Sequence, residues 1–272
     1  MLQDKTIGFI GGGAIAEALM RGMLKAGLVL ATQIIVNDIS KDRLDYLNTT
    51  FGVAISSDSQ EVAAKVDVLF LTVKPQVINL LLDTIAPVVS KTTTVISVAA
   101  GVTITTLQNK MPGVPIVRVM PNTPVAVGEG MSAIALGKYA GAKIGERVSI
   151  IFTSVGKVVT VDESTMDAVT GLSGSGPAYA YLLIDALSDA GVRVGFSRQT
   201  ALLLAAQTLL GAAKMVLETG EHPAKLRDMV TSPGGTSIAG IHMLEQRGVR
   251  AALMDAVVAA TQRSREMGKK NG

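Results

Sequence analysis

Two hydrophobic patterns divide the chain near residue 162. Before that point, short runs rich in β-branched residues alternate with stretches of helical periodicity. We expect strands at 6–10, 34–37, 68–73, 94–98, 116–120, 131–136 and 157–161, and helices at 14–26, 42–48, 59–65, 76–85, 103–110 and 141–153. Residues 68–71 are apolar throughout, as in a strand covered on both faces. The alternation predicts an α/β domain over residues 1–162 with a mostly parallel sheet.

Local signals mark where two of these helices begin or end. Gly27 follows the first helix in the position of a C-terminal glycine. Ser57 with Gln60 has the spacing of a capping box at the start of the third helix.

From residue 163 onward the pattern is helical only. We expect helices at 164–190, 198–219, 224–230, 235–247 and 249–267. The helix at 198–219 is apolar nearly all round, because Leu203, Leu204 and Leu210 lie off the seam that contains Leu202 and Leu209. Such a helix must be buried on most sides. We therefore predict an all-helical dimerisation domain over residues 163–272, intertwined with a second copy in a homodimer.

The composition of the chain limits the classes of function that it can have. Apolar residues make up 48% and charged residues 17%, which excludes a disordered chain. The net charge is only +3, with five Phe, four Tyr and no Trp, so we expect no nucleic-acid partner. There is no Cys and there are two His, which argues against thiolate chemistry and metal centres. We see neither a secretory leader nor an uninterrupted membrane span and expect a cytoplasmic protein.

A glycine-rich turn joins the first strand to the first helix. Residues 8–16 read Gly-Phe-Ile-Gly-Gly-Gly-Ala-Ile-Ala, which gives a G-x-G-x-x-A pattern at Gly11, Gly13 and Ala16. The first glycine allows a tight turn, the second lets backbone N–H groups approach a pyrophosphate, and the alanine permits close packing of helix on strand. The helix N-terminus adds partial positive charge. In this setting the pattern predicts a Rossmann-type dinucleotide-binding domain.

Further candidate residues stand where strands end. Asp38 follows the second strand, where an acid can accept hydrogen bonds from the adenosine ribose. It would repel a 2′-phosphate, whereas Lys41 and Arg43 would attract one, so the choice between NADH and NADPH stays open. Asp38 as a simple turn residue is the alternative. The pair Lys74-Pro75 and the segment 99–101 end two more strands, at the edge where open α/β sheets bind ligands.

A second glycine turn lies near the C-terminus. Residues 232–237 read Ser-Pro-Gly-Gly-Thr-Ser and precede a helix. Free N–H groups and hydroxyls at a helix start suit an anion such as a carboxylate, although an ordinary N-cap is the simpler alternative. A third segment, Gly-Leu-Ser-Gly-Ser-Gly-Pro at 171–177, serves close helix packing or leaves space for the nicotinamide.

Together these segments resemble the pyrroline-5-carboxylate reductases. The matching segments follow one another in order over essentially the whole chain, at 8–16, 73–75, 99–103, 120–124, 169–179, 212–217 and 232–238. The resemblance implies NAD(P)H-dependent reduction of 1-pyrroline-5-carboxylate to L-proline, the last step of proline biosynthesis. It also implies a Rossmann domain with a helical C-terminal domain that forms an interlocked dimer, often assembled further into a decamer.

The resemblance also implies a set of site residues. It places the cofactor loop on Ile10, Gly11, Gly12, Gly13, Ala14 and Ile15, the ribose contact on Asp38, and further cofactor contacts on Ser59, Val73, Lys74, Pro75, Val98, Ala99 and Ala100. It places the substrate carboxylate on Ser232, Gly234, Gly235 and Thr236. The hydroxyl that faces the ring nitrogen, implied as the catalytic group, falls on Ser237, where the family usually has threonine.

This chemistry suits a chain so poor in acid–base residues. Hydride addition to a cyclic imine is easiest when the nitrogen is already protonated, so a positioning hydroxyl and proximity to the nicotinamide suffice. A β-hydroxyacid dehydrogenase is one alternative, but Ala180 stands at the position of its acid/base lysine and Ile184 at that of its asparagine. A non-catalytic dinucleotide-binding protein is the other, and the intact second glycine turn argues against it.

Overall fold

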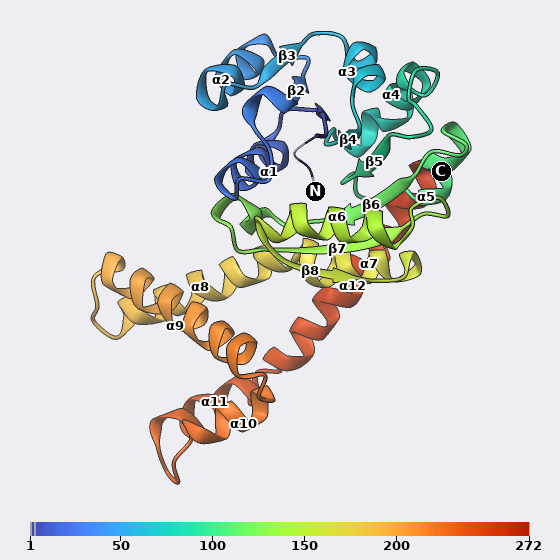
Figure 1. Ribbon diagram of the computed structural model, residues 1–272. Helices are drawn as coiled ribbons and strands as arrows, with labels where there is room; N and C mark the ends of the chain where they lie inside the picture. Colours follow the sequence, from blue (N-terminus) through green and yellow to red (C-terminus); the bar gives the residue numbers. More distant parts are fainter. Residues whose placement is uncertain (1, 3, 272) are drawn as a thin grey trace. The chain divides into compact units, whose positions relative to one another are not determined.

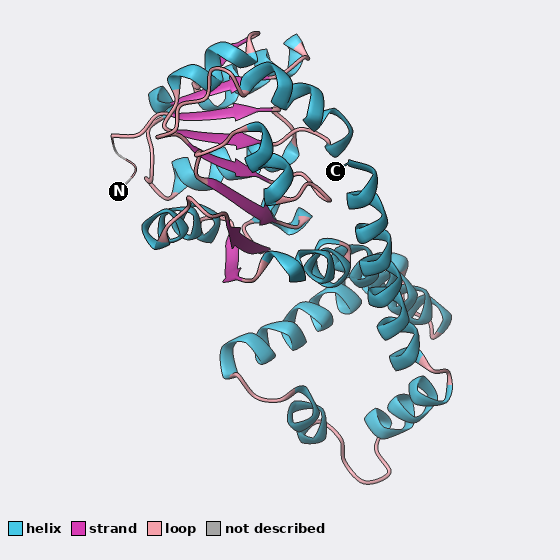
Figure 2. Ribbon diagram, turned by 90° about the vertical axis from the view of Figure 1, so that its right-hand side faces the viewer, coloured by secondary structure: helices cyan, strands magenta, loops and turns pink. Residues whose placement is uncertain are grey.

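The computed structural model describes residue 2 and residues 4–271 (Figure 1). Within these residues, an eight-stranded sheet has the order β3-β2-β1-β4-β5-β6-β7-β8. The strands are β1 (Ile7–Ile10), β2 (Ile34–Asn37), β3 (Ala54–Ser56), β4 (Val68–Leu71), β5 (Thr94–Ser97), β6 (Ile116–Met120), β7 (Gly130–Leu136) and β8 (Gly156–Thr160). Only the β6–β7 pair among them is antiparallel. The predicted Rossmann-type, mostly parallel sheet is confirmed (Figure 2).

Two buried clusters cover the two faces of this sheet. One packs α1 (Ala14–Lys25), α2 (Lys41–Phe51) and α6 (Ala142–Thr153) on the sheet, and the other packs α3 (Ser59–Lys65), α4 (Ile78–Ile85) and α5 (Ile104–Lys110). Side chains alternate between the faces, so Phe70 joins the first cluster and Leu69 and Leu71 the second. The Phe70 ring stacks on Phe9 with centroids 4.6 Å apart.

The C-terminal part is helical throughout. Its helices are α7 (Met166–Val169), α8 (Gly176–Arg193), α9 (Arg198–Thr219), α10 (Pro223–Met229), α11 (Thr236–Gln246) and α12 (Val249–Asn271). The chain forms two compact units, residues 1–175 with 259–272, and residues 176–258. The second half of α12 therefore belongs to the same compact unit as the sheet. Its Ser264 donates a 2.6 Å hydrogen bond to Asp167 within that unit.

Helix α9 leaves most of its apolar surface open in the single chain. Ala201 and Ala205 are its buried residues, whereas Leu203 and Leu217 are about two-thirds exposed, at 68% and 70%. The predicted burial of α9 on most sides is therefore not achieved within one copy of the chain. By length and composition alone, α9 is also the one helix of the described residues that could cross a membrane.

Three local predictions were wrong. The N-cap of α3 is Asp58, which accepts a 2.8 Å hydrogen bond from the Gln60 N–H, and not Ser57. The short edge strand β3 was not predicted, because its three residues carry no hydrophobic alternation. The helix expected at 164–190 is interrupted by a π-helical turn at Thr170–Gly174.

Candidate functional site

The first glycine turn is fixed by the end of β4. Gly11 has a φ of +99°, and a Cβ there would lie 2.8 Å from both the C and O atoms of Thr72. The Gly11 N–H donates to Asn37 O at 2.8 Å, and the Thr72 hydroxyl donates to Gly11 O at 2.6 Å. Both the backbone conformation and the close approach therefore require glycine at position 11.

Gly13 differs from Gly11 in both respects. It is the N-cap of α1 with a φ of −66°, and a Cβ there would meet nothing within 4 Å. In the part of the chain that the structure describes, no side-chain cap hydrogen bond is formed at the start of α1. The start of α1 therefore offers free donors and open space, which is the arrangement that binds phosphate.

Asp38 is a turn residue and a pocket residue at once. Its Oδ2 accepts a 2.7 Å hydrogen bond from the Gly12 N–H, and its Oδ1 accepts one of 2.9 Å from the Ser40 N–H. A carboxylate has about four acceptor sites, so these two bonds leave room for two more. The two interpretations of Asp38 from the sequence are therefore compatible.

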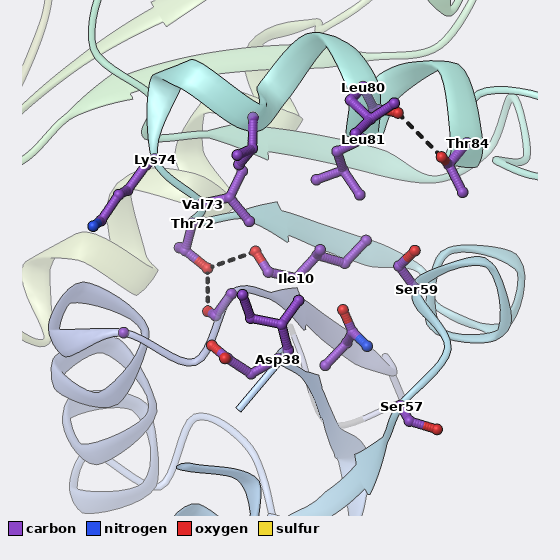
Figure 3. A pocket seen from close by; sticks show the side chains of 15 residues that line it. Ile10, Asp38, Ser57, Ser59, Thr72, Val73, Lys74, Leu80, Leu81 and Thr84 are labelled. Atoms are coloured by element: carbon purple, nitrogen blue, oxygen red, sulfur yellow. Dashed lines mark hydrogen bonds between the residues drawn. The ribbon is translucent and has the colours of Figure 1, made fainter. Parts of the chain in front are cut away.

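A pocket of about 610 Å³ opens beside the glycine turn (Figure 3). Its volume is in the usual range for small-molecule sites. Seven of the predicted cofactor residues line it: Ile10, Gly11, Gly13, Asp38, Ser59, Val73 and Lys74. Eight further lining residues were missed: Asn37, Ile39, Ser57, Thr72, Val77, Leu80, Leu81 and Thr84. The last four come from α4 and the short turn before it, and no motif in the sequence marks them.

The remaining predicted cofactor residues lie outside the lining of this pocket. They are Gly12, Ala14, Ile15, Pro75, Val98, Ala99 and Ala100. Ala99 is buried after β5, and Gly101 beside it has a φ of +73°. A Cβ on Gly101 would lie 3.4 Å from the backbone nitrogen of Gly268 in α12. The C-terminal helix therefore packs closely on the loop that follows β5.

Charged side chains secure the outer side of the glycine turn. The Arg43 Nε donates to Gly12 O at 2.5 Å, and its guanidinium pairs with Glu17. Burial is the largest single influence on Glu17 and raises its pKa. The hydrogen bonds from Arg43, Arg21 and Tyr46 outweigh it and hold the pKa below its ordinary value.

The second glycine turn lies in the unit of residues 176–258. The Gly235 N–H donates to Ser232 O at 3.0 Å, and Gly234 has a φ of +66°, as in a type II turn with Pro233 at its second position. A Cβ on Gly235 would collide with Ser232 Oγ. Thr236 and Ser237 then form the first turn of α11. The structure thus brings all the predicted substrate residues into one turn, with a glycine as the N-cap.

The third glycine segment is explained by packing. A Cβ on Gly174 would lie 2.6 Å from the Met120 Cε, so a larger residue would displace the Met120 side chain. The Asn122 amide donates to Ser173 O at 3.2 Å, and its oxygen accepts from the Met131 N–H at 2.8 Å. Asn122, which sequence reasoning gave no role, therefore ties the π-helical turn to β6 and β7.

Comparison with known proteins covers both parts of the chain. Residues 163–267 match the family model for pyrroline-5-carboxylate reductase dimerisation, and residues 6–101 match the model for NADP oxidoreductases that are coenzyme F420-dependent. A pyrroline-5-carboxylate reductase of Methanosarcina acetivorans is 47% identical over 99% of this chain and 100% of its own. One from Arabidopsis thaliana is 48% identical over 96% and 95%.

Solved structures agree. The reductase of Coxiella burnetii has a TM-score of 0.91 at 36% identity and covers 97% of this chain and 98% of its own. The pyrroline carboxylate reductase of Plasmodium falciparum, solved with NADP bound, has a TM-score of 0.88 at 32% identity over 98% and 99%. The resemblance found in the sequence is confirmed, and the chain belongs to the pyrroline-5-carboxylate reductase family.

Proposed function

We propose that the protein reduces 1-pyrroline-5-carboxylate to L-proline with NADH or NADPH as the hydride donor, in the cytoplasm. The open N-terminus of α1 at Gly13, beside a pocket of about 610 Å³, carries the proposal of a dinucleotide coenzyme. The substrate is taken from the relatives, which match over nearly the full chain and are named for this reaction.

The coenzyme would lie along the carboxyl ends of β1, β2, β4 and β5. The N–H groups at the start of α1 would hold its pyrophosphate, and Asp38 would accept hydrogen bonds from its ribose hydroxyls. Ile39 and Leu80 are exposed apolar residues of the same pocket and suit the faces of the adenine ring. The other cofactor residues of this proposal are Ile10, Gly11, Gly12, Ser59, Val73, Lys74, Pro75, Val98, Ala99 and Ala100.

The substrate carboxylate would bind the turn formed by Ser232, Gly234, Gly235 and Thr236. This turn offers backbone donors at the start of α11, and an 11-residue helix adds the favourable end of its dipole. The hydroxyl of Ser237, in the same helical turn, would orient the ring nitrogen.

The reaction makes few demands on acid–base groups. When bound, the reduced nicotinamide supplies a hydride to the carbon of the C=N bond. The ring nitrogen, protonated beforehand, takes up the electron pair of that bond and becomes the amine of proline. The chain's own residues need only bind and orient the imine and keep it near the coenzyme.

A second copy of the chain would cover α9. The family model matched by residues 163–267 is one of dimerisation, which supports a homodimer. We propose that its dimers assemble further into decamers. Light scattering over a range of concentrations tests both steps, and a monomer mass throughout would refute them.

One assay tests the proposed reaction. Oxidation of NADH and of NADPH is followed at 340 nm with 1-pyrroline-5-carboxylate as the substrate. As the control for an alcohol dehydrogenase, 3-hydroxyisobutyrate is supplied with the oxidised coenzyme, and formation of NADH or NADPH is followed instead. We expect turnover with the imine only. Ser237→Ala should lower kcat without weakening coenzyme binding, whereas Ser237→Thr, the family's usual residue, should retain activity. Absence of imine turnover in the wild type would refute the proposal.

A further inference from the structure

One residue of the glycine turn, Gly12, contacts both an anion and a cation. The Gly12 N–H donates to Asp38 Oδ2 at 2.7 Å, and the Gly12 carbonyl accepts from Arg43 Nε at 2.5 Å. The carboxylate lines the coenzyme pocket, whereas Arg43 is absent from its lining. The charge that faces the pocket at the end of β2 is therefore negative.

Glu17 holds Arg43 away from the pocket. The Glu17 Oε2 accepts a 2.5 Å hydrogen bond from the Arg43 guanidinium, which also donates to Gly13 O at 3.4 Å and lies 5.0 Å from the centroid of the Tyr46 ring. Glu17 is itself fixed by Arg21 at 2.8 Å and by the Tyr46 hydroxyl at 3.1 Å. Both partners of the pair are partly buried, with side chains 27% and 20% exposed, so solvent screens the attraction less than at the surface.

We infer that Glu17 makes the enzyme prefer NADH to NADPH, because it retains Arg43 on the glycine turn and leaves Asp38 uncompensated opposite the coenzyme ribose. This inference rests on the proposed function, in which a dinucleotide occupies the pocket. Glu17 contacts no part of the coenzyme in this account. It is a positioning residue that determines specificity through Arg43.

The chemistry of the 2′-phosphate explains the preference. NADPH carries this phosphate, with a charge close to −2, where NADH has only a hydroxyl that a carboxylate can accept. The Asp38 carboxylate repels the phosphate. A guanidinium binds phosphate through two parallel N–H donors, but the Nε and Nη2 groups of Arg43 already point to Gly12, Gly13 and Glu17, which hold the guanidinium on the glycine turn. Exposed Lys41 supplies only a strongly hydrated point charge.

The decisive variant is Glu17→Gln, which keeps the size of the side chain and removes the charge that holds Arg43. We expect the ratio of the NADPH to the NADH dissociation constant to fall at least tenfold. Arg21→Gln is the matched control, because Arg21 binds the same glutamate and leaves the Glu17–Arg43 pair intact, so its ratio should stay unchanged. The double variant Glu17→Gln, Arg43→Gln should not show this fall in the ratio, since it also removes the released guanidinium.

Binding is read from the fluorescence of each reduced coenzyme and, independently, by calorimetry with 2′,5′-ADP and ADP. Wild-type protein that binds NADPH as tightly as NADH would overturn the inference, and so would a ratio unmoved by Glu17→Gln or equally improved in the double variant. Asp38→Asn, which keeps the acceptor to Gly12 without the charge, must lower the ratio even if Glu17→Gln fails to fold. If neither coenzyme bound, the proposed function itself would be refuted.

Discussion

Alanine substitution of two nearby glycines, Gly11 and Gly13, separates a glycine that the fold requires from one that a ligand requires. Alanine at Gly11 would have to adopt a φ of +99° and place its Cβ 2.8 Å from the Thr72 carbonyl. Alanine at Gly13 would keep a φ of −66°, which any L-residue adopts, and its Cβ would enter open space.

The expected effects on folding differ accordingly. For Gly11→Ala, the left-handed conformation costs about 1–2 kcal/mol and the overpacking against β4 about 1–3 kcal/mol, so the free energy of unfolding should fall by about 2–5 kcal/mol. For Gly13→Ala, the loss at an N-cap is about 0.5 kcal/mol, and the smaller entropy of the unfolded chain offsets about the same amount. The stability of Gly13→Ala should therefore stay close to that of the wild type.

For coenzyme binding, Gly13→Ala is the informative variant. The Cβ at position 13 would occupy the space that the pyrophosphate needs, so the dissociation constant for NADH should rise at least about tenfold, equivalent to about 1.4 kcal/mol. Since the chain has no Trp, binding is best followed by the emission of NADH, and unfolding in urea by circular dichroism. Gly13→Ala protein that is destabilised like Gly11→Ala, or that binds NADH as tightly as the wild type, would refute this reasoning.

Other predictions concern stability. Glu163→Ala should lower the free energy of unfolding by about 2–3 kcal/mol in urea titrations, since Arg118, with a side chain only 6% exposed, would lose its carboxylate partner. Glu163→Gln, which can still accept from the Ile104 N–H, should lose less. Burial raises the pKa of Asp67, but hydrogen bonds from Lys5 and Thr6 outweigh it and lower the pKa. Asp67→Asn should therefore be less stable than wild type at pH 7, and the difference should shrink as the pH falls below about 4 and vanish once the pH is below the lowered pKa.

Elements with strong local signals could be predicted from the sequence. The bounds predicted for α9 match the structure, because Ser197 caps its start by accepting from the Thr200 N–H and Gly220 ends it with a φ of +67°. By contrast, β3 depends on pairing with β2, and two of its three residues are exposed. Its formation is decided by the neighbouring strand, which no local pattern records.

The same division applies to the site. The turn at Gly11 and Gly13 is one contiguous motif, so the sequence identifies it, although contacts with Asn37 and Thr72 fix its conformation. Leu80, Leu81 and Thr84 form one wall of the pocket because α4 packs beside β1 and β4. No residue spacing in the sequence indicates this wall. Arg43 shows most clearly what cannot be predicted about the site from the sequence. The sequence makes it a candidate for a phosphate contact, but it is paired with Glu17, a partner 26 residues away.

The glycine-rich segments are similar in sequence, but the atoms that a Cβ would contact at each glycine distinguish their roles. A Cβ on Gly174 or on Gly235 would meet the Met120 or the Ser232 side chain, so local packing favours glycine at both positions. Gly13 has no such explanation, but open space by itself is not sufficient: Gly141, the N-cap of α6, is equally open and does not line the pocket beside the glycine turn. Gly13 combines open space with a helix N-terminus and a pocket, and from this combination we infer that ligand binding accounts for the glycine.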